Sequence, residues 1–596
     1  MVLSKECISP RISSLVLSLI FLIACSDPLE KQSDLKEATQ QPTEIPVDKI
    51  QNKISKPQDK PADAIGQNKP PASSTRTTTS DITTPIQDPN IGKPKGGKLI
   101  QLFRDPPTMD PHLTTDNISG RLVNEVFGGL VTLGLDLNVT PDLAERIEVS
   151  ADGLRYTFHL RKDATFHNGK PVTSEDVRWS LERVADPETQ SPVAAQYLSD
   201  IVGVSEKLKG QATTISGLRT PDEYTVILTI DQPKAYFLSK LTYPTAFVLD
   251  RENLENYGVD WLRQPNGTGP FKLAEYQVGE LLRLARNENY HLGPANIDEV
   301  EFLLAGGNAM LMYENDEIHV TGVGLADLER VLDPNEPLNA EIITAPTLFS
   351  VGYIGMNVNE PPFDDPSFRR ALNLAIDRDT IASVVLEGSN IPAKTIIPPG
   401  FPSHSPNVIG YRYDPVKAHE LITESKYGND LDNLPRITLS ISGSFGANVP
   451  LALEVILQAW KDTLGIEVEI QQTEWATFLQ DLHNRRYQMF QLGWAADYAD
   501  PENFLDILFH SESENNHTNY SNPEVDRLLL QARVEPNQET RFTLYNQIEQ
   551  MILDEAPWVL LWNSGETYAL IKPEVKGYEL TAMTIPKYRY VYFEQN

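Results

Sequence analysis

The segment between residues 437 and 492 changes its hydrophobic period repeatedly, and no other feature constrains the fold as much. Apolar residues alternate with polar ones where a strand is expected, and recur every three or four residues where a helix is expected. The predicted strands carry Ile437, Leu439 and Ile441, then Ile466, Val468 and Ile470, and finally residues 487–492. The predicted helices carry Leu453, Ile456, Leu457, Trp460 and Leu464, then Trp475, Phe478, Leu479 and Leu482. Because a strand-helix-strand unit brings its strands parallel through a right-handed crossover, the pattern predicts an α/β fold with an open sheet.

Residues 493–501, with the sequence Gly-Trp-Ala-Ala-Asp-Tyr-Ala-Asp-Pro, follow the last of these strands directly. They are predicted to form a loop at the carboxyl end of a strand, which is where open α/β sheets bind ligands. Asp497 lies in this loop between two large aromatic residues, Trp494 and Tyr498. Burying an unpaired carboxylate is costly, so we expect Asp497 to have a partner, and the nature of that partner decides the function.

Length and charge narrow the class of protein. The chain has 596 residues, of which 40% are apolar and 22% charged, so we expect two or three globular units. The formal net charge is -32, which argues against nucleic-acid binding because phosphate contacts need clusters of Lys and Arg. A cationic or zwitterionic ligand is compatible with this charge.

The N-terminus has the features of an export signal. Lys5 and Arg11 precede an uncharged run over residues 15–24, which suits a signal peptide and is too short to span a bilayer. The run ends in Leu-Ile-Ala-Cys at Cys25, which resembles the lipobox of bacterial lipoproteins. We therefore predict a signal peptide over residues 1–24 and acylation of Cys25. The only other cysteine, Cys7, would be removed with the signal, so no disulfide is expected.

Residues 25–95 are predicted to be a disordered tether. Gln, Lys, Pro, Ser and Thr dominate this stretch, which has no aromatic residue and no apolar period. Acyl chains on Cys25 would hold the protein at the membrane, on its extracytoplasmic side.

Other site types find little support. His159 and His167 have no further His, Cys or carboxylate at ligand spacing, so neither a metal nor a cofactor is predicted. The chain has no nucleotide phosphate loop and no nucleophile or zinc motif of common hydrolases. An exported hydrolase with Asp497 and Asp500 as acid and base stays open as an alternative, although Asp500, before Pro501, is better explained as a turn or helix-cap residue.

Seven motifs occur in order from about Gly96 to the C-terminus. They lie at residues 152–161, 166–169, 266–271, 286–290, 362–366, 370–378 and 493–504. In this order they resemble the extracellular solute-binding proteins of peptide-type ABC importers, the group of oligopeptide-binding and dipeptide-binding proteins.

This resemblance implies a class II periplasmic-binding-protein-like α/β fold, with two hinged lobes and an extra α/β domain. Lobe I is expected over residues 96–128, 257–346 and 565–596, the extra domain over 129–256, and lobe II over 347–564. The hinge strands are expected near residues 348–356 and 557–564.

The resemblance also implies a binding site. Asp497 would pair with the α-ammonium of a peptide, and main-chain groups of Gly493 and Ala495 would bond the peptide backbone as an added strand does. Trp494 and Tyr498 would be walls, and Thr115 and Asn117 would supply polar contacts. Some relatives have a basic residue for the peptide carboxylate where this chain has Gln491, so that end of the ligand has no predicted partner.

The implied function is capture of peptides between the lobes by a lipid-anchored monomer, which closes on its ligand and delivers it to the permease of an ABC transporter. ATP hydrolysis would take place in other subunits. Alternatives with the same fold are binding of an oligosaccharide, a metal chelate or another solute, and a sensing or adhesion lipoprotein that does not transport.

Overall fold

The computed structural model describes residues 80–83, 96–443, 448–583 and 587–594. The predicted signal peptide, the acylation of Cys25 and nearly all of the predicted tether lie outside these residues. The chain divides into two compact units, Met1–Thr75 and Arg76–Asn596, and all the elements below belong to the second. In the part of the chain that the structure describes, no helix combines the length and apolar character needed to cross a membrane.

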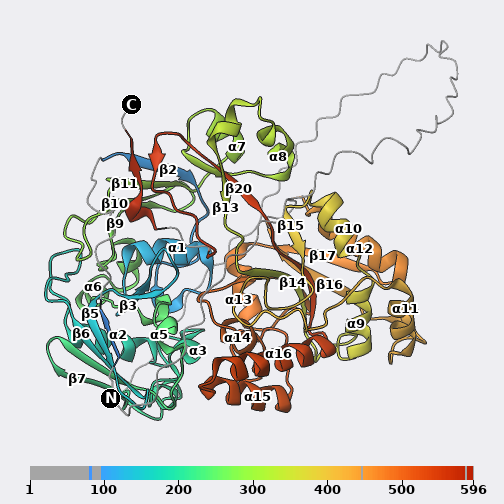
Figure 1. Cartoon of the computed structure of the whole chain (residues 1–596), viewed down its shortest axis with the longest axis horizontal. Helices are drawn as coiled ribbons and strands as arrows, with labels where there is room; N and C mark the ends of the chain where they lie inside the picture. Colours follow the sequence, from blue (N-terminus) through green and yellow to red (C-terminus); the bar gives the residue numbers. More distant parts are fainter. Residues whose placement is uncertain (1–79, 84–95, 444–447, 584–586, 595–596) are drawn as a thin grey trace, which may run out of the picture. The chain divides into compact units, whose positions relative to one another are not determined.

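Seven strands form the first sheet, in the order β13-β20-β12-β2-β11-β10-β9 (Figure 1). They are β2 (Lys98–Leu102), β9 (Phe271–Gln277), β10 (Leu281–Arg286), β11 (Glu299–Leu303), β12 (Val320–Gly322), β13 (Ile342–Ala345) and β20 (Thr567–Ile571). The associated elements are α1 (Asn117–Val126), α7 (Ala309–Glu314), α8 (Leu325–Leu332), β21 (Val575–Lys576) and β22 (Tyr592–Phe593). Helix α1 packs in this region because Leu122 and Val126 join Leu99 and Phe302 in one buried cluster.

A second, antiparallel sheet has the order β1-β5-β6-β8-β7. Its strands are β1 (Ser80–Thr83), β5 (Ala144–Val149), β6 (Arg155–Leu160), β7 (Leu218–Asp222) and β8 (Thr225–Thr229). The associated elements are β3 (Val131–Leu133), β4 (Val139–Pro141), α2 (Ser174–Val184), α3 (Ala194–Leu198), α4 (Val204–Leu208), α5 (Phe237–Lys240) and α6 (Arg251–Tyr257). At the start of α2, the Asp176 carboxylate accepts a hydrogen bond from the Thr173 backbone N–H at 2.9 Å, which caps the helix.

Strand β1 corrects the predicted tether. Ser80–Thr83 falls within residues 25–95 but pairs with β5 in a register from Ser80–Val149 to Thr83–Arg146. Four residues are too few to show a hydrophobic period, and the open edge of β5 is not visible from local sequence. The folded part therefore includes residues before Gly96.

The third sheet is mixed, with the order β15-β19-β14-β18-β16-β17. Its strands are β14 (Ser350–Met356), β15 (Asn390–Pro392), β16 (Ile437–Ser442), β17 (Val468–Thr473), β18 (Met489–Ala495) and β19 (Trp558–Ser564). The associated helices are α9 (Pro366–Leu374), α10 (Arg378–Thr380), α11 (Pro415–Glu424), α12 (Leu451–Leu464), α13 (Trp475–His483), α14 (Glu502–Phe509), α15 (Pro523–Val534) and α16 (Gln538–Glu555). Strand β16 pairs in parallel with both β17 and β18, as the alternating pattern predicted.

One boundary in this sheet was predicted wrongly. Strand β18 continues to Ala495, so Gly493, Trp494 and Ala495 are strand residues and the loop begins at Ala496. Antiparallel pairing with β14, which places Ala495 opposite Ser350, keeps these residues extended. The partner strand is far away in sequence, and a glycine followed by a tryptophan gives no local sign of it.

The chain passes twice between the first and third sheets. Residues 346–349 connect β13 to β14, and residues 565–566 connect β19 to β20. Strands β14 and β19 are neighbours, so the two crossings leave the third sheet from adjacent strands. We use the names lobe I, extra domain and lobe II for the parts built on the first, second and third sheets. Their exact boundaries and the hinge remain predictions.

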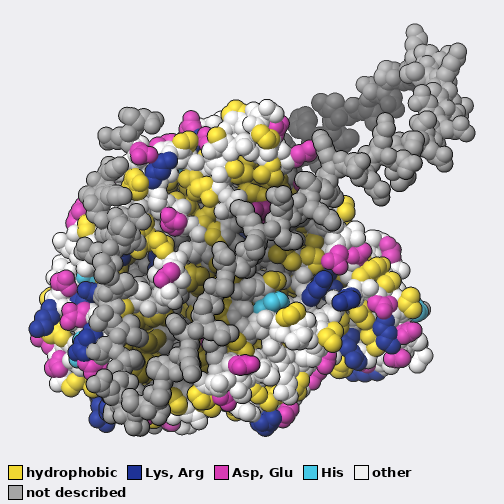
Figure 2. Space-filling view, in the orientation of Figure 1, with side chains coloured by type: hydrophobic (Ala, Val, Ile, Leu, Met, Phe, Trp, Pro, Cys, Tyr) yellow, Lys and Arg dark blue, Asp and Glu magenta, His cyan; other side chains and the backbone are white. Residues whose placement is uncertain are grey.

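Figure 2 shows Lys and Arg side chains interspersed with Asp and Glu on the face that is drawn. A nucleic-acid-binding surface would need basic side chains gathered in a patch or stripe. The part of this face formed by described residues has a mixed charge instead.

Candidate ligand-binding site

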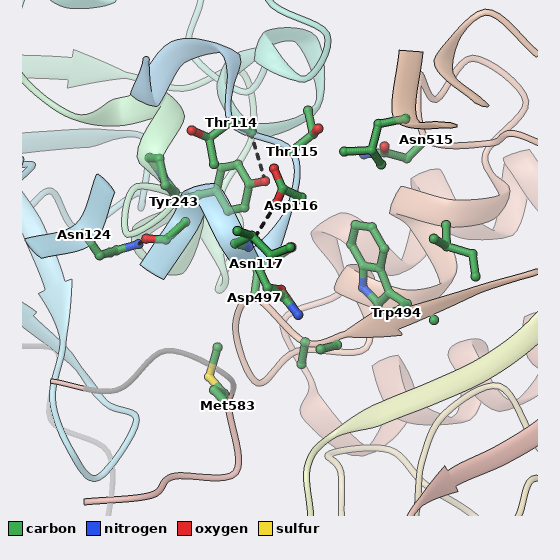
Figure 3. Close-up of a pocket in the computed structure, with 18 of the residues that line it drawn as sticks. Thr114, Thr115, Asp116, Asn117, Asn124, Tyr243, Trp494, Asp497, Asn515 and Met583 are labelled. Atoms are coloured by element: carbon green, nitrogen blue, oxygen red, sulfur yellow. Dashed lines mark hydrogen bonds between the residues drawn. The ribbon is translucent and has the colours of Figure 1, made fainter. Parts of the chain in front are cut away.

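A cavity of about 290 Å³ lies between side chains of the two lobes and the extra domain. Figure 3 shows Tyr243 and Asn124 on one side of it, and Trp494 and Asn515 on the other. Among its lining residues are Thr114, Thr115, Asp116, Asn117 and Asn124 of lobe I, Tyr243 of the extra domain, and Trp475, Leu492, Gly493, Trp494, Ala495, Asp497 and Asn515 of lobe II. The predicted site residues of both lobes, Tyr498 excepted, thus line one cavity.

The edge of β18 facing this cavity is open. Strand β16 pairs with β18 only at Met489 and Phe490, so among the described strands none covers that edge further along. On the opposite edge, the Ala496 N–H donates to the Phe349 carbonyl at 2.8 Å. Because main-chain groups alternate in direction along a strand, this bond turns those of Gly493 and Ala495 toward the open edge. Both residues therefore offer backbone donors and acceptors to the cavity.

Asp497 follows β18 and is held by two polar side chains. Its Oδ2 accepts hydrogen bonds from the Tyr197 hydroxyl at 2.6 Å and from the Asn503 side-chain amide at 3.0 Å. The Asp497 N–H donates to Asn503 Oδ1 at 3.0 Å, which fixes the turn. The side chain is partly exposed to the cavity but otherwise surrounded by protein, and this burial raises its pKa to about 6. No Lys, Arg or His nitrogen of the described residues lies within 4.0 Å of its carboxylate.

A second carboxylate approaches from lobe I. Asp116 caps α1, and its Oδ1 accepts hydrogen bonds from the N–H groups of Ile118 and Ser119 at 2.9 and 3.1 Å. Its Oδ2 is buried and has no hydrogen-bond partner in the described structure. Like Asp497, it forms no ion pair with another described residue. The cavity therefore holds two carboxylates, one from each lobe, that lack a cationic partner among the residues that the structure describes.

Lys587 supplies a basic side chain to the same cavity. Its Nζ donates to Thr132 Oγ1 at 3.2 Å, and no carboxylate of the described residues lies within 4.0 Å. Burial lowers the pKa of Lys587, while attraction to Glu125 opposes the shift. The cavity thus presents both signs of charge, as a zwitterionic ligand would require.

Three large aromatic side chains, those of Tyr243, Trp475 and Trp494, line the cavity. Trp494 is oriented by a hydrogen bond from its Nε1 to Asn503 Oδ1 at 3.1 Å. Tyr243 stacks on Tyr197 with ring centroids 3.8 Å apart, and its hydroxyl donates to the Thr114 carbonyl at 3.2 Å. Asn503 therefore holds both Trp494 and Asp497 in place.

Tyr498 has a different place from the one predicted. It is 1% exposed and does not line the cavity, and its hydroxyl donates to the Glu502 carboxylate. The loop turns after Asp497, so that the two aromatic residues flanking this carboxylate point in different directions. Tyr498 is part of the core.

Asp500 is a helix-cap and ion-pair residue. Its Oδ1 accepts the Glu502 N–H at 3.0 Å at the start of α14. Arg541 binds the carboxylate with two nitrogens, at 2.6 and 2.8 Å. This bidentate pair leaves Asp500 unable to act with Asp497 as an acid and base pair, so the hydrolase alternative loses its only candidate residues.

The remaining predicted residues differ in position. Thr115 and Asn117 line the cavity. Gln491 of β18, which pairs with Ile354 of β14, does not. His159 contacts Glu148 at 3.1 Å and His167 contacts the Gly269 carbonyl at 3.1 Å, so the two histidines have separate partners. Within the described residues, no group of three or more His, Cys, Asp or Glu could hold a metal ion.

Comparison with known families decides the class of protein. The model of "Bacterial extracellular solute-binding proteins, family 5 Middle" matches residues 138–516. The chain belongs to this family. Its members bind solutes and are not enzymes, so the predicted recognition and the predicted lack of enzymatic activity are confirmed.

Two curated relatives illustrate the range of ligands in the family. The dipeptide-binding protein DppE of Bacillus subtilis is 28% identical over 504 residues, which cover 81% of this chain and 90% of that protein. The probable deoxycholate-binding periplasmic protein YgiS of Escherichia coli is 30% identical over 496 residues, 80% of this chain and 91% of that protein. Similarity of this degree fixes the family and leaves the solute open.

Solved structures confirm the predicted fold. OppA of Haemophilus influenzae, in complex with the peptide RPPGFSPFR, is 25% identical and has a TM-score of 0.75, with 84% of this chain and 99% of that chain covered. The unliganded open form of the murein tripeptide-binding protein MppA, also 25% identical and with coverage of 84% and 98%, has a TM-score of only 0.59. The described fold is therefore closer to the peptide complex than to the open form.

Proposed function

We propose that this solute-binding protein captures peptides with a free amino terminus in the cavity between its lobes and delivers them to the permease of an ABC importer. The observation that carries the proposal is the Asp497 carboxylate, which has no cationic partner among the described residues and follows an open strand edge. A peptide ammonium and this carboxylate, desolvated together, form a strong charge-assisted pair. A ligand without an amine would leave the carboxylate unpaired, so the site selects for amines.

The open edge of β18 suits a peptide main chain. A peptide anchored at Asp497, just beyond the end of β18, would run antiparallel to the strand past Ala495 and Gly493. Backbone hydrogen bonds to these two residues give affinity without dependence on side chains, as in other cases of strand addition. Gly493 is exposed and has no side chain to obstruct the approach.

Contacts across the lobes support closure on the ligand. The Tyr197 hydroxyl of the extra domain reaches Asp497 of lobe II at 2.6 Å, and the Asn515 amide of lobe II reaches Gln196 at 2.7 Å. Trp475 of lobe II donates to Asp116 of lobe I at 3.4 Å. A peptide that touches both lobes would favour this closed arrangement by its differential affinity, and the crossings at residues 346–349 and 565–566 would serve as the hinge.

The affinity for free-amine peptides should depend on pH. The pKa of Asp497 is raised to about 6, so the ligand-free carboxyl group is mostly protonated below that pH. A bound ammonium favours the ionised form, hence proton uptake competes with peptide binding. Affinity should fall by up to tenfold per pH unit below about pH 6 and be nearly constant above pH 7. Titration calorimetry from pH 4.5 to 8 would measure this. The control is an N-acetylated peptide of the same sequence, whose affinity should not fall below pH 6 because it has no ammonium to pair with the carboxylate.

We also propose that acylated Cys25 anchors the protein, as a monomer, outside the cytoplasm. Replacing Cys25 by Ala should move the protein from the membrane fraction to the soluble extracytoplasmic fraction, since one lost acylation site removes all acyl chains. Fractionation followed by immunoblotting would detect the change. Membrane association that persists in the Cys25→Ala protein would contradict lipid anchoring and leave peptide capture unaffected.

Mass spectrometry of ligands released from the purified protein tests the proposed cargo. Peptides with free amino termini are the expected result. A sterol, a sugar or a metal chelate would contradict the proposal and show that this member carries another solute. Loss of peptide uptake in a deletion strain would then separate transport from sensing or adhesion.

A further inference from the structure

His517 is a buried side chain that lines the cavity without a hydrogen-bond partner. It is 6% exposed, and neither Nδ1 nor Nε2 has a partner in the described structure. Its backbone is fixed, because its N–H donates to the Asn515 carbonyl at 2.9 Å. The preceding Asn516 binds the Tyr520 carbonyl at 2.7 Å, which holds the segment in place. A buried imidazole whose two nitrogens both lack partners is unusual, and the cavity that this side chain lines is the place from which a ligand group would reach it.

The position of His517 relative to β18 defines which part of a ligand it would meet. Its ring lies 6.2 Å from that of Phe490, and 5.2 Å from that of His483 in α13. Phe490, Leu492 and Trp494 lie on the same face of β18, since side chains alternate along a strand. His517 is therefore on the Leu492 and Trp494 face. We call the part of the cavity lined by Leu479, Leu482, His483, Leu492, Trp494 and His517 the compartment.

An added strand would direct alternate side chains into this compartment. A peptide along the open edge of β18 places every second side chain on the Leu492 and Trp494 face. The walls there are mainly apolar, with the two histidines as the polar groups. Burial lowers the pKa of His517 well below its usual range, and the nearby His483 and Arg485 lower it further. Its imidazole is therefore neutral.

We propose that this compartment is a side-chain subsite, in which His517 selects a neutral ligand side chain that has an apolar body and a hydroxyl or carboxamide end. The inference rests on the proposed function, because it requires a peptide along β18. A neutral imidazole has one donor and one acceptor nitrogen, and a hydroxyl or carboxamide can pair with either. A purely apolar side chain leaves both nitrogens unpaired. A cationic side chain would be desolvated beside two imidazoles that offer it no counter-charge.

The test compares tripeptides that differ by a single oxygen. Tri-alanine peptides with Phe or Tyr at each position in turn are titrated into the protein by calorimetry. At one position the Tyr peptide should bind roughly tenfold more tightly than its Phe counterpart, as expected for one buried hydrogen bond. His517→Phe should bring this ratio to about one. His517→Gln, which retains a donor and an acceptor, should preserve a preference for Tyr.

A control and the contradicting outcomes separate this inference from the proposed function. His419→Phe makes the same substitution at an exposed histidine outside the cavity, and should leave the Tyr to Phe ratio unchanged. A wild-type ratio near one at every position, or a ratio that survives His517→Phe, would overturn the role of His517 while peptide binding stands. If none of the peptides binds to the wild type, both the proposed function and the subsite are wrong.

Discussion

Replacing Asp497 by Asn should weaken the binding of free-amine peptides by roughly two to three orders of magnitude. The substitution keeps the shape of the side chain, and its oxygen can still accept from Tyr197 and Asn503. It removes the charge, however, and leaves a desolvated ammonium without its counter-charge, which costs about 2–5 kcal/mol. Titration calorimetry at pH 7.5 would measure the loss. An N-acetylated peptide, which leaves the wild-type carboxylate unpaired, should bind Asp497→Asn at least as tightly as it binds the wild type.

The same substitution should stabilise the ligand-free protein. A pKa raised from 3.8 to about 6 means that folding favours the protonated carboxyl group. The free energy of unfolding of the wild type therefore increases as pH falls from about 6 to 3.8, and at pH 7 the ionised carboxylate destabilises the folded state. The cost at pH 7 is at most about 3 kcal/mol, because each pKa unit corresponds to about 1.4 kcal/mol. Asp497→Asn should therefore raise the melting temperature without ligand. An unchanged peptide affinity together with a higher melting temperature would assign Asp497 a structural position outside the peptide site.

Asp116→Asn is the matched control from lobe I. Asparagine caps a helix as well as aspartate does, so α1 should remain intact. Only the negative charge facing the cavity is lost. A decrease in affinity much smaller than that of Asp497→Asn is expected, since Asp497 is the direct partner in the proposal. An equal or larger decrease would place the ammonium at Asp116 instead.

The sequence made strands β16 to β18 of the third sheet predictable because strands and helices alternate there in a short stretch. Strands β16, β17 and β18 and helices α12 and α13 each show their period locally, and parallel pairing follows from the crossover. The end of β18 was not predictable, since its last residues are extended only through pairing with β14. Local pattern thus determined the elements, and pairing with a distant strand determined where one of them ended.

Only part of the candidate site could be predicted from the sequence, for a related reason. Asp497 could be proposed as a site residue from its aromatic neighbours and the family motif, but Tyr197, which donates to it, is 300 residues away in the chain. Likewise, Trp494 and Tyr498 both flank Asp497, and the sequence does not distinguish their roles. Only the turn after Asp497 places Tyr498 in the core and Trp494 at the cavity. His517 carries no motif at all. Its proposed role rests on the lack of a hydrogen-bond partner for either ring nitrogen in the described structure, and such a lack cannot be seen in a sequence.

Replacing Lys240 by Met should disfavour closure and reduce peptide affinity substantially. Lys240 of the extra domain lies 2.9 Å from Glu502 of lobe II, and their side chains are 5% and 2% exposed. Burial raises the pKa of Glu502 to about 7 despite the attraction of Lys240. Burial also disfavours charge on Lys240, but Asp200 and Glu502 together raise its pKa above the usual value. Glu502 therefore depends on Lys240 for its charge, whereas Lys240 is also paired with Asp200, at 3.2 Å.

Breaking this pair should raise the free energy of the closed arrangement more than that of the open arrangement. Without Lys240, Glu502 is either buried as an unpaired charge or takes up a proton, and breaking such a buried pair costs up to about 3–5 kcal/mol. Lys240 and Glu502 come from parts that the proposed hinge separates, so opening would return Glu502 to solvent and relieve the cost. Lys240→Met should thus increase the open population, which small-angle scattering would detect as a larger radius of gyration, and weaken peptide binding in calorimetry.

Two further variants show whether the effect concerns closure or general stability. Lys240→Met combined with Glu502→Gln removes both charges and should recover much of the affinity, because no charge is left unpaired. Lys207→Met breaks a buried pair at 3.1 Å with Glu182, which lies entirely within the extra domain. It should lower the melting temperature with little change in affinity. If Lys240→Met behaves like Lys207→Met, with reduced stability and unchanged affinity, the Lys240–Glu502 pair stabilises the fold and does not control closure.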